Sequence, residues 1–287
     1  MVRYLVDEKD YSERHACQLV GISRSTYRYE RRVAEDEAEL RTRLHELANE
    51  HEAYGYRMVG KLLRREQGTV NHKRIHRLWK EEGLQQPKRK PCKRYLGPKG
   101  EVKKKAQYPN HVWSYDFAED RTTKGSKVRI LAVLDEHTRE CLALISARSI
   151  SSRDVLLLLD WLFLVRAVPA HIRSDNGPEF VAKRVRQWLK KRQCKTIFIT
   201  PGSPWENPFV ESFIGTLRRE CLDRYLFDTH RQAQGLLEWW RGEYNGRRPH
   251  SSLDYLTPEE FAEQARAAHM LAEPAHSETI VTPILSS

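Results

Sequence analysis

The chain has few cysteines, no long apolar run and no leader-like start. Its five cysteines are odd in number, widely spaced and without a Cys-x-x-Cys pair, which excludes a disulfide framework and predicts free thiols in a reducing compartment. The most apolar stretch, Val155–Val165, is too short to cross a bilayer and contains Asp160. Charges at Arg3 and Asp7 argue against a signal peptide. We therefore expect a cytoplasmic protein with no membrane partner.

Two kinds of site are missing as well. His72 and His76 have the spacing of half a zinc site, but no Cys-x-x-Cys accompanies them and Cys92 stands alone, so we predict no structural zinc. No hydroxyl nucleophile comes with a plausible His and Asp pair, which disfavours a serine or tyrosine recombinase.

Positive charge is concentrated in one part of the chain. The net charge is +11, and residues 61–105 hold 16 Lys or Arg against 4 Asp or Glu, a net of +12. The rest of the chain therefore sums to −1. A charge that served only solubility would not be localised so sharply, and the block favours a polyanionic partner such as nucleic acid.

Three carboxylates stand in contexts that favour a shared site. Val112–Ala118 alternates as a half-buried strand does, with Asp116 on the face opposite the aromatic residues. Asp175 ends a second strand, because the Asn-Gly-Pro that follows breaks it. Glu211 lies on a helix that Asn207 is expected to cap, with Pro208 in its first position. Carboxylates that converge in this way can hold the two Mg²⁺ ions used in phosphodiester chemistry.

The spacing carries a resemblance. Between Asp175 and Glu211 there are 35 residues, and this Asp, Asp, thirty-five, Glu pattern resembles the catalytic core of retroviral integrases and insertion-sequence transposases. Five flanking segments match too: Trp113–Phe117, Asp135–Leu142, Ser174–Phe180, Glu211–Leu222 and Tyr244–Leu253. Together they resemble the second-frame product of a large bacterial insertion-sequence family, whose full transposase is a fusion of two overlapping reading frames. The resemblance covers about Tyr11 to Phe261.

The resemblance implies an activity. The chain would cut the ends of its own element with water, and the freed 3′-OH would attack another phosphodiester, with no covalent protein–DNA intermediate. Asp116 and Asp175 would share two Mg²⁺ ions and Glu211 would hold the second, and Mn²⁺ is expected to substitute. The implied partners are double-stranded DNA at element ends and target, further copies of this chain on DNA, and a first-frame product. Such a protein would associate with the bacterial nucleoid.

The resemblance also implies a ribonuclease-H-like core. The pattern from residue 111 predicts strands at 112–118, 128–135, 141–147, 170–174 and 196–199, with helices at 152–167, 181–192 and 232–244. We expect an α/β fold, a mixed five-stranded sheet with flanking helices, preceded by all-α helix-turn-helix modules. Strands one and four should be neighbours, which would bring Asp116 and Asp175 together. Ser152 is a candidate cap for the first of these helices.

Two helix-turn-helix patterns precede the core. In the first, Ser12 and Ser23 can cap helices that end at Val20 and Arg32, and Gly21 permits the turn. Its second helix carries three basic residues at helical spacing, Arg24, Arg28 and Arg31. DNA contact and a helical hairpin that packs elsewhere remain equal alternatives for this pattern. An amphipathic helix with Leu40, Leu44 and Leu47 on one stripe should follow at 34–52.

The second pattern, 54–83, is stronger. Asn71 caps its second helix, Ile75, Leu78 and Trp79 form a buried stripe, and Gly83 ends it. The opposite stripe is basic and is expected to face DNA; it consists of Lys73, Arg77 and Lys80.

The expected domains follow from these patterns. They are 1–52, the first module with the amphipathic helix; 53–84, the second module; 85–110, a basic linker; 111–265, the catalytic core; and 266–287, a weakly ordered tail.

In relatives the loop at 200–206 contacts DNA and carries Asp where this chain has Glu206. The resemblance assigns Arg218 to a terminal phosphate, with Arg219 a less certain neighbour. Arg247, Arg248 and His250 either face DNA or close the domain.

Two other functions stay open at this point. A second-frame product made alone could bind DNA without catalysis and act as a regulator. A metal-dependent nuclease of the same fold would cut without joining. Detection of strand transfer, rather than nicking alone, separates these cases.

Overall fold

The structure is a computed structural model of the 287-residue chain, and it describes residues 1–29, 34–87, 104–175, 177–200 and 206–272. Arg31, Cys92, most of the predicted linker, most of the loop before Glu206 and the end of the predicted tail lie outside the described residues. The chain forms two compact units, Met1–Glu50 and His51–Ser287. In the described part of the chain, no helix is long and apolar enough to cross a membrane.

The described residues of the first unit form the helices α1 (Val2–Asp7), α2 (Glu13–Val20), α3 (Arg24–Tyr27) and α4 (Glu37–Glu50). The predicted caps are confirmed, because the hydroxyls of Ser12 and Ser23 accept hydrogen bonds from backbone N–H groups of α2 and α3. The predicted helix Arg24–Arg32 is too long, because α3 ends at Tyr27; residues 30–32 lie outside the described residues. The helix α3 has no fully buried residue, so little apolar burial stabilises a longer one.

The second unit opens with the helix pair α5 (Tyr56–Gln67) and α6 (His72–Glu81). The Asn71 side chain accepts a hydrogen bond from Lys73 N at 2.9 Å, as the capping prediction requires. Gly83 has φ +68°, the left-handed conformation that favours glycine after a helix end. The predicted stripe of Ile75, Leu78 and Trp79 is buried.

The sheet has the predicted five strands, β1 (Val112–Arg121), β2 (Lys127–Asp135), β3 (Cys141–Ala147), β4 (His171–Ser174) and β5 (Lys195–Phe198). Their order is β3-β2-β1-β4-β5, antiparallel through β1 and parallel from β1 to β5. The expectation that strands one and four are neighbours is confirmed.

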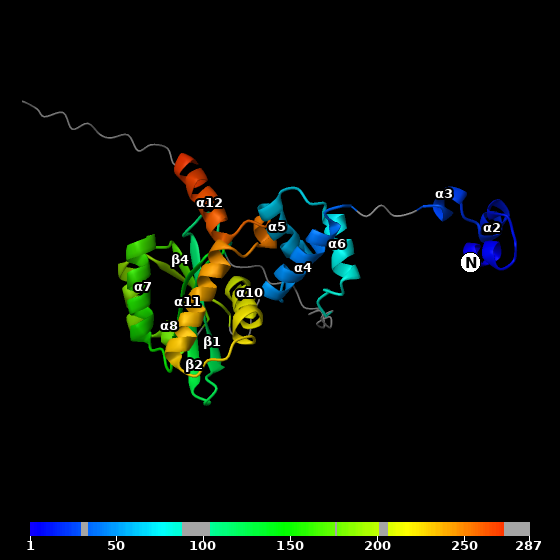
Figure 1. Ribbon diagram of the computed structural model, residues 1–287. Coiled ribbons are helices and arrows are strands. Elements are labelled where there is room, and N and C mark those ends of the chain that lie inside the picture. Colours follow the sequence, from blue (N-terminus) through cyan, green and yellow to red (C-terminus); the bar gives the residue numbers. More distant parts are fainter. Residues whose placement is uncertain (30–33, 88–103, 176, 201–205, 273–287) are drawn as a thin grey trace, which may run out of the picture. The chain divides into compact units, whose positions relative to one another are not determined.

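Helices cover both faces of the sheet (Figure 1). On one face lie α7 (Ser152–Arg166), α8 (Pro178–Val181) and α9 (Lys183–Lys191). On the other lie α10 (Pro208–Leu217), a π-helix η2 (Arg218–Leu222) and α11 (His230–Gly246). A short 3-10 turn η3 (Ser251–Leu253) and α12 (Pro258–Ala272) end the described chain. Each face has its own apolar core.

Three predictions about helices are corrected. Ser151, not Ser152, caps α7, and it does so through a reciprocal capping box with Asp154. The predicted helix 181–192 divides at Ala182, whose extended ψ of 131° interrupts the helical backbone. The predicted tail is helical through residue 272, because α12 buries Ala262 and Arg266 pairs with Glu140 at 2.5 Å. The four cysteines in the described ranges are free and buried, in agreement with the thiol prediction.

Candidate active site

Asp116 lies in the middle of β1, half-buried and next to α10. The alternation of this strand is confirmed, since Trp113 and Tyr115 pack into the core under α7 while Ala118 packs into the core under α10. Asp116 shares the side of Ala118, because successive residues of a strand point to opposite faces. Its carboxylate accepts a hydrogen bond from Phe117 N at 2.7 Å.

Asp175 follows the last residue of β4 directly. The parallel register pairs Ser114 with Arg173, so two residues further along the strands Asp175 comes level with Asp116. The Asp175 carboxylate accepts a hydrogen bond from Gly177 N at 3.0 Å. A Cβ on Gly177 would lie 3.0 Å from that same carboxylate oxygen, which explains why glycine occupies this position. Asn176 lies outside the described residues.

Glu211 lies in the first turn of α10 and is exposed. Val210, Phe213 and Leu217 anchor the helix on the β1–β2 face of the sheet, which leaves Glu211 on the side of the helix away from the core. Pro208 occupies the first turn as predicted, but Asn207 does not cap with its side chain. With φ −125° and ψ 45°, Asn207 departs from the extended conformation that directs a cap toward the helix N–H groups.

The charges of the other two carboxylates act on Asp116. The pKa of Asp116 is raised to about 6, first by burial and then by the negative charges of Asp175 and Glu211, against the hydrogen bond from Phe117 N–H. Burial also raises the pKa of Glu211. The two sequence-distant acids are therefore close enough to Asp116 to affect its ionisation.

This donor set suits a hard divalent cation. Among the described residues, no group of three or more His, Cys, Asp or Glu side chains is already arranged as a metal site. The chemistry nevertheless fits, because three oxygen donors with uncompensated negative charge are what Mg²⁺ prefers in proteins. Asp116, Asp175 and Glu211 are the side chains that would hold it.

In the metal-free protein, the Asp116 carboxyl should titrate near pH 6. Asp175→Asn should lower this pKa more than Glu211→Gln does, because the Asp175 charge is the larger influence. Neither variant should restore the ordinary value of 3.8, since burial is the main cause. Carbon-13 NMR of labelled aspartate carboxyl carbons measures these shifts. A wild-type titration near 4, unmoved by either variant, would show that the acids do not form a cluster.

The cations assigned to DNA fall into different environments. Lys73 and Lys80 are exposed on α6, while Arg77 pairs with Glu81 at 3.0 Å. In the first unit Arg24 is exposed, and Arg28 pairs with Glu13 at 2.8 Å. Their contact with DNA stays a prediction.

Arg218 is exposed and follows α10, the helix that carries Glu211. Its guanidinium donates to Glu119 O of β1 at 3.0 Å. It begins the π-helix η2, an element that sequence patterns do not reveal and that is frequent at functional sites. Arg219 donates to the Thr216 hydroxyl at 3.1 Å. The role of either residue at a terminal phosphate stays a prediction.

Other residues of the resembling segments have structural roles. Arg248 is half-buried and forms a two-pronged ion pair with Glu220, with both distances 2.7 Å, and His250 is half-buried beside it. These two residues close the domain, the second of the two alternatives considered for them. Arg247 is exposed and pairs with Glu243 at 3.2 Å. Glu206, buried, accepts hydrogen bonds from Thr200 and fastens the ends of the loop.

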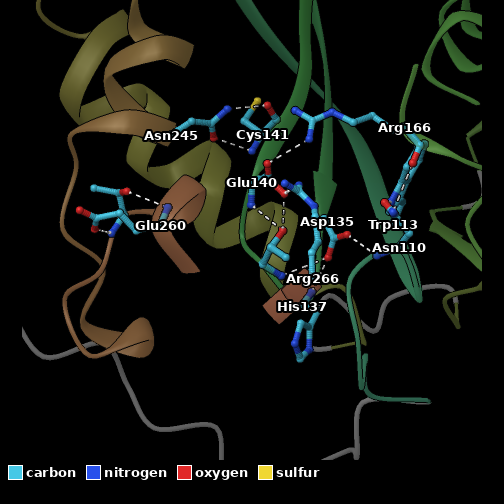
Figure 2. Close-up of polar contacts among 12 residues, drawn as sticks. Asn110, Trp113, Asp135, His137, Glu140, Cys141, Arg166, Asn245, Glu260 and Arg266 are labelled. Carbon is cyan, nitrogen blue, oxygen red and sulfur yellow. Dashed lines mark hydrogen bonds and ion pairs between the residues drawn. The ribbon is translucent and has the colours of Figure 1, made fainter. Parts of the chain in front are cut away.

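The segment between β2 and β3 anchors the end of the sheet away from the carboxylates. Figure 2 shows its side chains meeting residues from several elements. Asp135 accepts from Asn110 N at 2.7 Å, and Glu140 accepts from both Arg166 and Arg266. The Asn245 amide pairs with the backbone of Cys141 in both directions. These contacts give the segment a structural role, because they join it to the start of β1, to α7, to α11 and to α12.

Comparisons with known proteins agree with this geometry. Two descriptions of an integrase core domain match residues 106–204 and 192–258, and that of an HTH-like domain matches residues 35–91. A protein of insertion element IS407 from Burkholderia multivorans is 38% identical over 261 residues, which cover 91% of this chain and 94% of that protein. This chain belongs to the bacterial insertion-sequence transposase family.

Further relatives of this transposase-family chain extend the likeness. The putative transposase InsK of insertion sequence element IS150 from Escherichia coli K12 is 29% identical, with 85% of this chain and 90% of that protein covered. A chain in the cryo-EM structure of the simian T-cell lymphotropic virus intasome with PP2A regulatory subunit B56 gamma superposes with a TM-score of 0.50 at 14% identity. The superposition covers 85% of this chain and 78% of the intasome chain. That likeness concerns the fold, which is the ribonuclease-H-like fold expected from the sequence.

Proposed function

We propose that this chain is a DNA transposase that cuts element ends and joins the resulting 3′-OH to another phosphodiester. The observation that supports the proposal is the fold, an integrase core in which Asp116 lies on β1, Asp175 directly follows the neighbouring parallel strand β4, and Glu211 lies on α10, which packs on β1. Relatives of this chain bear the name transposase. A non-catalytic role is not favoured, because the chain matches an integrase core domain and its named relatives are transposases.

The three acids have one shared task. Asp116 and Asp175 come from neighbouring parallel strands, and Glu211 from the helix that packs over the first of them. Two bound Mg²⁺ ions, or Mn²⁺ in their place, would activate the attacking oxygen and stabilise the leaving oxygen. The half-buried position of Asp116 reduces solvent competition for its oxygens. Below about pH 6 protons would compete for this carboxylate, so cation affinity should fall with decreasing pH.

A strand-transfer assay tests the proposal. Labelled element-end DNA is incubated with the full chain and Mg²⁺ or Mn²⁺, and products are separated on a denaturing gel. Joined products longer than the substrate support a transposase, whereas nicked products alone indicate a nuclease. If the chain binds DNA and does neither, the same assay on the two-frame fusion shows whether a first-frame product is required.

Joining two element ends requires more than one copy of the chain, and α7 offers a surface for this. Its inner side is buried in the core, yet four apolar side chains on its outer side are between half and largely exposed: Leu157 at 63%, Trp161 at 54%, Leu164 at 85% and Val165 at 50%. An apolar stripe of this kind on a charged protein is typical of an interface between subunits.

Leu164→Lys together with Trp161→Lys should therefore weaken self-association. Burying one large apolar side chain is worth about 1.5–3 kcal/mol, so losing two should raise the dissociation constant roughly a hundredfold or more. Sedimentation velocity, with and without element-end DNA, measures the change. Leu271→Lys on α12 is the matched control, because Leu271 is 89% exposed and lies outside the stripe. Equal behaviour of the double variant and the control would rule α7 out as the interface.

A further inference from the structure

A cavity that none of the three carboxylates lines lies at the helix pair α5–α6. Its volume is about 190 Å³, several times the ~30 Å³ that one water molecule occupies. The pocket is also lined by one residue far along the sequence, Tyr255, which follows η3 of the catalytic core. The lining residues from the helix pair are Tyr56, Arg57, Gly60, Lys61, Arg64, His72 and Ile75. Basic residues Lys73 and Lys80, assigned to DNA from the sequence, are not among them.

The cations of this pocket lack carboxylate partners. No acidic residue lines the cavity, and within the described ranges none of Arg57, Lys61 and Arg64 forms an ion pair. Arg57 instead donates to the Tyr56 hydroxyl at 3.1 Å, and Arg64 to Val70 O at 3.0 Å. Three uncompensated cations around one small cavity favour an anionic ligand, and a phosphate group fits this charge and size.

Tyr255 is held firmly at the pocket. Arg65, the neighbour of Arg64, pairs with Glu260 at 2.7 Å and donates to Tyr255 O at 3.2 Å. Tyr255 N–H also donates to His250 O at 2.7 Å. Both Asp254 and Tyr255 have positive φ, 52° and 64°, a conformation that non-glycine residues keep only where the surroundings require it.

A cation lies beside the Tyr255 ring, so the pocket offers an aromatic surface and a positive charge together. Lys61 Nζ lies 4.9 Å from the ring centroid. Double-stranded DNA offers phosphates and base edges, but its base faces are covered by stacking. An aromatic ring beside phosphate-binding cations is instead the arrangement that binds single strands, in which an unstacked base can lie on the ring.

We infer that the pocket binds a single-stranded DNA segment, with Arg57 and Lys61 on a phosphate and a base stacked on Tyr255. The inference rests on the proposed DNA-processing function, since cleavage at an element end exposes a strand terminus that the protein must keep. It adds a binding site, and the site does not include the three carboxylates. Its test therefore uses binding alone.

The test measures fluorescence anisotropy of a labelled 20-nucleotide thymidine oligomer with the full chain, in EDTA so that catalysis plays no part. Arg57→Gln with Lys61→Gln should weaken binding about tenfold and reduce the slope of log affinity against log salt by roughly 0.7, the value for the one phosphate that the two cations neutralise. Tyr255→Ala should weaken binding about tenfold, while Tyr255→Phe retains the ring and should bind as the wild type does.

Two comparisons exclude simpler explanations. Arg153→Gln with Lys191→Gln removes the same charge from α7 and α9 and should leave affinity within about twofold, because neither residue lines the pocket. An abasic oligomer of equal length should bind wild type and Tyr255→Ala equally. The inference is overturned if the pocket variants match the charge control, or if they weaken a duplex as much as a single strand and Tyr255→Ala has no effect. Failure of strand transfer would overturn the proposed function and leave this binding result unchanged.

Discussion

Glu211→Gln should abolish strand transfer while leaving DNA binding intact. The substitution keeps the size and shape of the side chain but removes one negative oxygen ligand from the site formed with Asp116 and Asp175. A bound divalent ion contributes several kcal/mol to transition-state stabilisation, so losing its ligand should reduce the joining rate by about a thousandfold or more. The measurement is the strand-transfer assay, run beside a gel-shift experiment with the same element-end DNA.

The matched control is Glu119→Gln. Glu119 is an exposed acid on the same strand as Asp116 and pairs with Lys127 on the surface at 2.7 Å. Its loss should change the rate by less than about twofold, because exposed ion pairs contribute little. Asp116→Asn and Asp175→Asn should behave as Glu211→Gln does. Joining at the wild-type rate by Glu211→Gln would mean that the activity arises elsewhere in the chain.

Arg173→Met should destabilise the catalytic core by about 3–5 kcal/mol, the cost of leaving a buried charge without its partner. Arg173 and Glu136 are both fully buried, with Arg173 Nε 2.7 Å from Glu136 Oε1. The same guanidinium donates to Lys104 O at 2.9 Å. Arg173 lies on β4, two residues before Asp175. The Arg173–Glu136 pair therefore also fixes the strand that leads to the second carboxylate. Urea unfolding followed by circular dichroism measures the loss.

The pH dependence of this variant provides a second readout. Burial raises the pKa of Glu136 and Arg173 counteracts that rise, so removing Arg173 should raise the pKa further. A carboxyl whose folded pKa exceeds its unfolded value binds protons more tightly in the folded state, so ionising it opposes folding. The loss of folding stability caused by Arg173→Met should therefore be smallest in acid, where Glu136 is protonated. It should grow as the pH rises above the pKa that Glu136 has in the unfolded chain.

A double variant tests whether the lost stability comes from the buried charge that Arg173→Met leaves unpaired. Glu136→Leu with Arg173→Met should recover at least half of the lost stability, because two apolar side chains leave no charge buried. A loss below about 1 kcal/mol in Arg173→Met alone would show that the ion pair is not needed to hold β4.

Much of the architecture could be predicted because it depends on local pattern. The alternation around Asp116, the caps at Ser12, Ser23 and Asn71, and the strand break after Asp175 each involve residues within one turn or strand. Helix lengths were less predictable. The first module's second helix ends at Tyr27 since it has no fully buried residue, and the last helix continues to residue 272 because Arg266 reaches Glu140. Pairing with a residue 126 positions away has no local signal.

The sequence by itself determined the fold class and the basic character of the chain, because periodicity and residue type can be read locally. It also predicted the three acidic residues of the site, because their spacing resembles that of a known catalytic core. Tertiary structure alone decided which charges meet. It placed Asp175 level with Asp116 through the β1–β4 register, paired Arg248 with Glu220, and brought Tyr255 beside Lys61. Such contacts depend on where chain segments pack, and in a chain this rich in cations only packing decides which ones find a partner.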